Sequence, residues 1–159
     1  MSMHFYYNYK ENLGSKLKEV YRRELKALDQ KRKQQKQLDI AQEIIEKYFD
    51  RLASEIEDVV NVSEGQIQFI KNEDVIMKFI MYNNYVRFSR FEQGIEVEIG
   101  VFDEESGLIE GRITSNIIPS DKRCVVKKIG KIHDRAHFDE NTINHYMSEA
   151  FSHIEILKD

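Results

Sequence analysis

Residues 66–102 read QIQFIKNEDVIMKFIMYNNYVRFSRFEQGIEVEIGVF, and apolar and polar side chains alternate along most of this segment. Alternation with a period of two is typical of strands that bury one face. Turn-forming residues interrupt it at positions 72–74, 83–84 and 93–94. The pattern therefore predicts consecutive antiparallel strands joined by one three-residue loop and two two-residue turns.

The three turns also predict a register. The first places Ile67 opposite Phe79, the second places Phe79 opposite Phe88, and the third places Phe88 opposite Ile99. A slip of one residue at any turn would move a whole strand to the other face. The expected core face consists of Ile67, Phe69, Met77, Phe79, Met81, Val86, Phe88, Val97, Ile99 and Val101. The opposite face is mixed and is expected to be solvated, with Lys78, Arg87, Ser89, Glu96, Glu98, Ile76, Ile80 and Phe91.

Two further strands are predicted before the sheet ends near residue 132. The fifth covers residues 108–118, with Ile109, Ile113 and Ile117 in phase. The sixth covers residues 123–132 and has two possible phases, one burying Val126 and Ile132 and the other burying Val125 and Ile129. Its lysines are typical of an edge strand, where charge discourages pairing with another chain.

The region before the sheet, about residues 10–62, has helical periodicity. Apolar residues recur at helical spacing in two sets, Leu13, Leu17, Tyr21, Leu25, Leu28 and then Leu38, Ala41, Ile45, Tyr48, Leu52, Ile56, Val59. The segment 29–37 between them has no apolar residue and no Gly, Pro or Asn. It is either the link of a helical hairpin or a solvated turn of one long helix, and the missing helix breakers favour the long helix.

Charge divides this helical region into two halves. Residues 10–36 contain ten Lys/Arg and four acids, a net of +6, whereas residues 37–65 contain two bases and eight acids, a net of −6. The halves neutralise each other if they lie antiparallel, either within a hairpin or between two chains in a coiled-coil dimer. Exposed ion pairs contribute only about 0.2–1 kcal/mol each, so the charges select an orientation. The sequence favours a homodimer joined through residues 15–60.

A C-terminal helix is predicted over residues 139–157. Asp139 is a natural N-cap, and an amphipathic stripe follows it, formed by Ile143, Met147, Ala150, Phe151, Ile154 and Leu157. We expect this helix and the N-terminal region to pack on the apolar face of the sheet. The predicted fold is one α+β domain over residues 1–159, with a five- or six-stranded antiparallel meander.

Composition is that of a soluble globular protein. The chain has 159 residues, a net charge of −4 and one cysteine, which excludes an internal disulfide and fits a reducing compartment. The N-terminus lacks the pattern of a secretory signal, and no apolar run reaches eighteen residues. These features predict a cytoplasmic protein without membrane association.

The histidines near the C-terminus are the weak candidates for a metal site. His133 and His137 are four residues apart, with Asp134 and Asp139 nearby. These are ligand types that divalent metals accept. The spacing matches no metal motif such as HExxH, and HDRAHFDEN also fits a polar loop before a capped helix. Neither a metal nor another cofactor is predicted.

No motif for nucleophilic catalysis or nucleotide binding is present. The chain lacks GxSxG, a P-loop and GxGxxG. Cys124 precedes two valines in a predicted strand, where a cysteine usually behaves as a small hydrophobe. No catalytic residue is predicted.

Two basic runs offer a possible anion or nucleic-acid contact. The first lies in KRKQQK and the second in the last predicted strand, at residues 122–131. The candidate contact residues are Lys31, Arg32, Lys33, Lys36, Lys127, Lys128 and Lys131. If the runs converged, they could follow a phosphate backbone, although the net charge of the chain does not indicate nucleic acid.

The sequence leaves three functions open, in order of preference. The first is a non-enzymatic protein–protein interaction or accessory protein that acts as a homodimer. The second is a nucleic-acid-associated accessory protein that uses the basic runs. The third is a small metal-dependent enzyme that uses His133 and His137. The order of the elements recurs in unrelated proteins and implies no function by itself.

Overall fold

A computed structural model describes residues 3–130 and 135–158 of the chain. The chain divides into two compact units, residues 1–35 and residues 36–159. The first unit contains α1 (Met3–Val20) and the beginning of α2 (Arg22–Glu55). The second unit contains the rest of α2, α3 (Glu57–Val62), the sheet and α4 (Glu140–Phe151).

The polar segment 29–37 is helical, because α2 continues through it. The long-helix interpretation is therefore confirmed, and the helical hairpin is excluded. At the junction of α1 and α2, the N–H of Tyr21 donates to the carbonyl of Leu17 at 3.0 Å, and the N–H of Leu25 donates to the carbonyl of Tyr21 at 2.9 Å. These are the four-residue hydrogen bonds of an α-helix, although Tyr21 itself is a turn residue that separates α1 from α2.

Within the described residues, seven antiparallel strands form the sheet, and each pairs with the next in the chain. They are β1 (Ile67–Ile70), β2 (Val75–Met81), β3 (Asn84–Arg90), β4 (Ile95–Phe102), β5 (Ile109–Ile118), β6 (Val125–Lys128) and β7 (Arg135–His137). The α+β antiparallel meander is confirmed, but five or six strands is wrong. The additional strand, β7, comes from the segment interpreted as a polar loop. It pairs with β6, so β6 is not an edge strand.

The predicted register has the correct faces but the wrong partners. Phe79 pairs with Phe69 and Val86, and Phe88 pairs with Val97. Each hairpin is thus offset by two residues from the predicted pairing. Because side chains alternate with a period of two, an offset of two does not by itself move a residue to the other face.

Two register shifts change faces that the sequence pattern predicts. A shift in β2 between Val75 and Met77 buries Ile76, which was expected on the solvated face. Another shift lies between Val97 and Glu98 of β4. Because of this shift, Ile117 and Ile109 of β5 lie on opposite faces of the sheet. Ile117 is buried, and Ile109 is 58% exposed. Such shifts are β-bulges, which insert a residue and reverse the phase beyond it.

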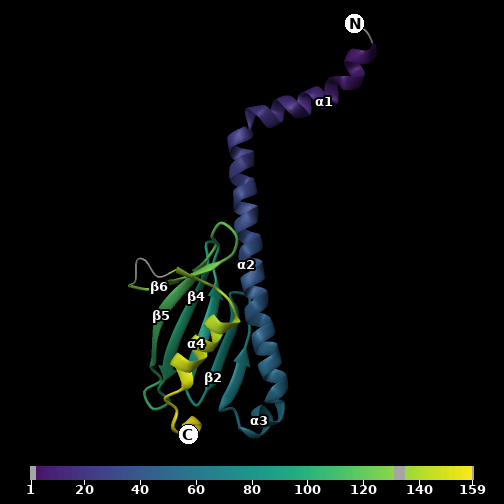
Figure 1. Ribbon diagram of the computed structural model, residues 1–159. Helices are drawn as coiled ribbons and strands as arrows, with labels where there is room; N and C mark the ends of the chain where they lie inside the picture. The colour runs from purple at the N-terminus through teal and green to yellow at the C-terminus, as the bar shows by residue number, and fades with distance from the viewer. Residues whose placement is uncertain (1–2, 131–134, 159) are drawn as a thin grey trace. The chain divides into compact units, whose positions relative to one another are not determined.

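The core lies between one face of the sheet and two helices, the C-terminal part of α2 and α4 (Figure 1). The ring of Phe49 in α2 lies 5.9 Å from that of Phe79 and 5.8 Å from that of Phe88, between centroids. From α4, Phe151 contacts Phe79 at 5.2 Å and Tyr146 contacts Phe88 at 5.9 Å. Both helices therefore pack on the same, inner face.

Most residues of the expected core face are buried or half-buried there. Val101 is the exception at 46% exposure, because it lies next to the end of β4. In β6 both Val125 and Val126 are buried, and Val126 joins the core cluster, whereas Ile129 is exposed. Ile132 was expected to be buried together with Val126 in one of the two possible phases, and it lies outside the described residues.

The C-terminal helix begins where the sequence predicts and ends earlier. Asp139 accepts a hydrogen bond from the N–H of Thr142 at 3.2 Å, and Thr142 Oγ1 accepts one from the N–H of Asp139, which completes a capping box. Helix α4 ends at Phe151, and a short 3₁₀ turn follows at Glu155–Leu157. Leu157, expected in the buried stripe, is 49% exposed.

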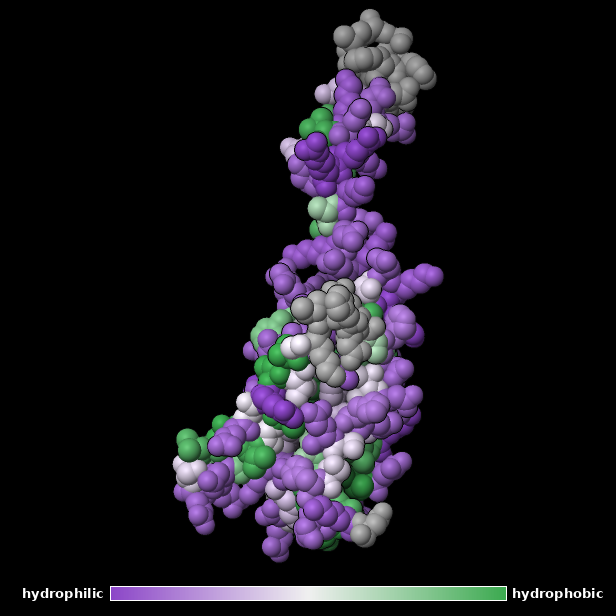
Figure 2. Space-filling view, turned by 60° about the vertical axis from the view of Figure 1, so that its left-hand side comes forward, coloured by the Kyte–Doolittle hydropathy of each residue, from purple (hydrophilic) through white to green (hydrophobic). Residues whose placement is uncertain are grey.

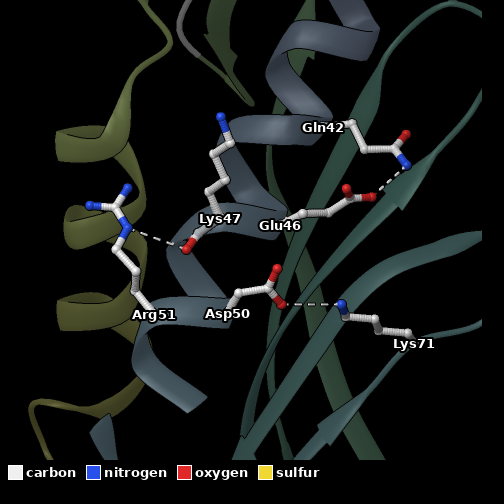
Figure 3. Close-up of polar contacts among 6 residues, drawn as sticks. All are labelled: Gln42, Glu46, Lys47, Asp50, Arg51 and Lys71. Atoms are coloured by element: carbon white, nitrogen blue, oxygen red, sulfur yellow. Dashed lines mark hydrogen bonds and ion pairs between the residues drawn. The ribbon is translucent and has the colours of Figure 1, made fainter. Parts of the chain in front are cut away.

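Polar contacts along the second half of α2 supplement the apolar packing (Figure 3). Lys71 Nζ, just after β1, lies 3.4 Å from Asp50 Oδ1. Within the helix, Gln42 Nε2 donates to Glu46 Oε1 at 2.9 Å. These side chains are mostly exposed, so the buried apolar face supplies most of the stabilisation.

Candidate functional site

The buried residues of α2 all lie in the second unit. Leu38, Ala41 and Ile45 are buried, and they are separated by three and four residues. Apolar residues separated by four and three residues also occur in α1, at Leu13, Leu17 and Val20. Because of this spacing, these three residues share one side of α1.

In the first unit this face is open to solvent. Among residues 9–35, whose side chains the structure describes, none is buried. Leu17 is 47% exposed and Val20 is 71% exposed. We call residues 9–35 the arm. We call five of its exposed apolar residues the arm seam, namely Leu13, Leu17, Val20, Tyr21 and Leu28.

Charged side chains surround the arm seam. The first unit, residues 1–35, has nine Lys/Arg and four Asp/Glu, a net of +5. In Figure 2 this unit shows hydrophobic residues in green among hydrophilic ones in purple. An apolar stripe bordered by charge is typical of a helix that pairs with another surface.

A second group of side chains lies on the outer face of the sheet. The hydroxyl of Tyr85 donates to Glu98 Oε2 at 2.7 Å, and Arg87 Nη2 lies 3.0 Å from Glu98 Oε1. Lys78 Nζ lies 4.7 Å from the centroid of the Tyr85 ring. Burial and the hydrogen bond to Glu98 raise the pKa of Tyr85 to about 12. These contacts connect β2, β3 and β4 on the outer face.

The sequence pattern did not single out Tyr85. The signal that could have revealed it is a pair of glycines within strands, because such glycines often mark a close approach. Tyr85 pairs with Gly100, and Gly100 pairs with Gly111. A Cβ at either glycine would meet the Tyr85 hydroxyl. The ring therefore needs both neighbouring positions to lack a side chain.

The histidines are not brought together as a metal site in the part of the chain that is described. His137 lies in β7 and is exposed, whereas His133 lies outside the described residues. His153 is engaged elsewhere, with a ring nitrogen 2.8 Å from Asn84 Oδ1. Among residues 3–130 and 135–158, no group of three His, Cys, Asp or Glu side chains is arranged to hold a metal ion.

Cys124 does not have the environment of a nucleophile. It is 4% exposed and belongs to the core cluster. Burial raises the pKa of its thiol to about 11, although the nearby charge of Arg90 lowers it. The reactive thiolate is therefore scarce at neutral pH, in agreement with the interpretation of Cys124 as a small hydrophobe.

The basic runs are divided between the two units. Lys31, Arg32 and Lys33 lie in the first unit, and Lys36, Lys127 and Lys128 lie in the second, while Lys131 is outside the described residues. Next to Lys36, the Gln37 side chain exchanges two hydrogen bonds with the backbone of Ser120, at 2.6 and 2.9 Å. Lys36 is thereby placed beside the loop that carries Lys122 and Arg123.

Comparisons with protein-family models, curated proteins and solved structures give no match for the chain. None of the described helices is long and apolar enough to cross a membrane. The arguments for function therefore rest on the arm and on the sheet.

Proposed function

We propose that the chain is a non-enzymatic interaction protein that acts as a homodimer, joined through the arm seam. One observation carries this proposal. The apolar residues Leu13, Leu17 and Val20 of α1 are exposed, at 44%, 47% and 71%. Burial of apolar surface contributes about 25 cal/mol per Å², so a partner that covers the arm seam would be stabilised by the same effect that holds α2 on the sheet.

The charges near the arm seam favour a second copy of the chain as that partner. The arm carries acids as well as bases, and Glu24 lies among its apolar residues. A polyanion would leave these acids without a favourable contact. A second copy offers the same apolar stripe and, in residues 36–159, a net charge of −9 that can offset the +5 of the first unit.

The polar side chains of the sheet support a role without catalysis. Tyr85 and Arg87 each contact the carboxylate of Glu98 on the outer face. Ser115 and Tyr146 form a buried hydrogen bond of 2.5 Å beneath α4, and burial raises the pKa of Tyr146 to about 12. These groups connect elements of the fold.

Light scattering on seam variants tests the proposal. We expect the unmodified chain to be a dimer and Leu13→Gln/Leu17→Gln to be a monomer, because glutamine keeps helix propensity and removes apolar surface. The matched control is Ile40→Gln, which changes a residue of α2 that is 59% exposed and lies off the buried face. This control should remain a dimer. A dimer that survives the double substitution would contradict the proposed interface.

A further inference from the structure

A cavity of about 310 Å³ lies on the outer face of the sheet, opposite the face on which α2 and α4 pack. Its lining residues all belong to the second unit, between Gly65 and Ile109. Sites for small molecules have about 300–1,000 Å³ and combine apolar walls with a few polar groups. This cavity is at the lower end of that range, so it can enclose only a small ligand.

The middle of the cavity is apolar. Ile80 and Tyr85 are paired residues of β2 and β3 whose side chains line it. The β4–β5 hairpin adds Phe102, which is 36% exposed, and Ile109, which is 58% exposed. Covering apolar surface is favourable, so the cavity suits a ligand with an apolar middle.

A cation without a counter-ion lines the same cavity. The Lys78 ammonium lies 4.7 Å from the centroid of the Tyr85 ring. Glu98, in the same row of the sheet, contacts the Tyr85 hydroxyl with one oxygen and Arg87 with the other. No carboxylate of the described residues pairs with Lys78. Its charge is therefore available to the carboxylate of a ligand.

An anion lines the cavity nearer the turn between β2 and β3. The N–H of Phe102 donates to the carbonyl of Asn83 in that turn at 2.7 Å, and Glu104 follows Phe102 by two residues. Glu104 is exposed, and no cation of the described residues pairs with it. Lys78 lies five residues before Asn83 along the chain. Lys78 and Glu104 therefore lie toward opposite ends of the cavity and do not neutralise each other.

We propose that this cavity binds a short apolar peptide with free ends, whose C-terminal carboxylate contacts Lys78 and whose N-terminal ammonium contacts Glu104. The length follows from the register. The Lys78 ammonium lies over the ring of Tyr85, which is paired with Ile80. Three residues, about 10 Å of strand, separate Ile80 from Asn83, and an extended tripeptide spans about the same length. The site lies outside the arm, so it does not depend on the proposed homodimer.

NMR titration of the isotope-labelled full chain with alanyl-leucyl-alanine tests the proposal. We expect saturable shifts of the backbone amide signals of Lys78, Tyr85 and Phe102 at millimolar peptide. The C-terminal amide of the peptide should bind at least about tenfold more weakly, because it lacks the charge that pairs with Lys78. The N-acetyl form should bind about two- to fivefold more weakly, because Glu104 is exposed and its ion pair is screened.

Variants of the chain assign the two contacts. Lys78→Gln should weaken binding of the free peptide about tenfold and should no longer distinguish the free peptide from its amide. Lys127→Gln changes an exposed lysine of β6 outside the cavity, and this matched control should bind like the unmodified chain. Absence of saturable shifts, or shifts confined to other residues, would overturn the proposal. Equal affinity of the unmodified chain for the free peptide and its amide would overturn the contact with Lys78, and equal affinity for the N-acetyl form would overturn the contact with Glu104.

Discussion

Tyr85 fits on the sheet because two paired residues beside it are glycines. A Cβ built on Gly111 would meet the Tyr85 hydroxyl and, at 3.0 Å, the carboxyl carbon of Glu98. A Cβ on Gly100 would in addition lie 2.6 Å from the backbone carbonyl oxygen of Glu110, which cannot withdraw as a side chain can. The conflict at Gly111 therefore depends on one hydroxyl and one flexible side chain, and it can be relieved by substitution.

We expect Gly111→Ala to lower the free energy of unfolding by about 1–3 kcal/mol, the usual range for overpacking. In a Tyr85→Phe background the loss of unfolding free energy should be much smaller, because the nearest neighbour of the new methyl group, the Tyr85 hydroxyl oxygen, is removed. Chemical denaturation of the four proteins gives the coupling energy. Gly14→Ala is the control, because no atom lies near its Cβ and alanine stabilises a helix. Equal losses in both backgrounds would contradict the packing of Tyr85 over the glycines.

Residue-scale rules explain why the register was predicted only in part. The turn after β2 is formed by Tyr82 and Asn83, with φ of 49° and 67°, and not by residues 83–84. A type I′ turn needs positive φ at both positions, and tyrosine rarely adopts it. The turn was therefore predicted at Asn83 and Asn84, because asparagine tolerates positive φ better than tyrosine does. The alternation of side chains fixes the face but does not distinguish registers that differ by two residues.

At the scale of elements, α4 begins with a capping box, of which the sequence predicted one of the two residues. Asp139 was predicted as the N-cap, and its reciprocal partner is Thr142. We expect Asp139→Ala to reduce the free energy of unfolding by about 1 kcal/mol, because the first turn of α4 loses an acceptor. Asp139→Ser should keep most of the stabilisation, because serine can also accept the capping hydrogen bond. Denaturation curves check both values, and Glu155→Ala, at an exposed residue, is the neutral control. Equal losses for Asp139→Ala and Asp139→Ser would show that the cap is not the cause.

The elements that the sequence did not predict have a local physical origin. The bulges insert Ile76 into β2 and Thr114 into β5, and each reverses the face of the residues beyond it. An alternating pattern cannot show this in advance. Strand β7 has three residues, too few for a periodic signal, and its pairing with β6 fixes it. In contrast, α2 has 34 residues, and its length and periodicity made it predictable.

For the molecule as a whole, charge is divided unevenly between the two units. The first unit carries +5, and the remaining residues 36–159 carry fifteen Lys/Arg and twenty-four Asp/Glu, a net of −9. The sequence showed this asymmetry but not which half of the apolar stripe is free, because only the structure shows that the half from Leu38 onward is buried on the sheet. The expected interface over residues 15–60 is therefore narrowed, in our proposal, to the arm.

The most direct test of the homodimer is sedimentation velocity on the unmodified full chain at micromolar concentrations. We expect a species of twice the chain mass of 18.9 kDa that dissociates on dilution. It should persist at about 1 M salt, where charge interactions are screened within roughly 3 Å and apolar burial is not weakened. A single species of monomer mass at every concentration would contradict the account.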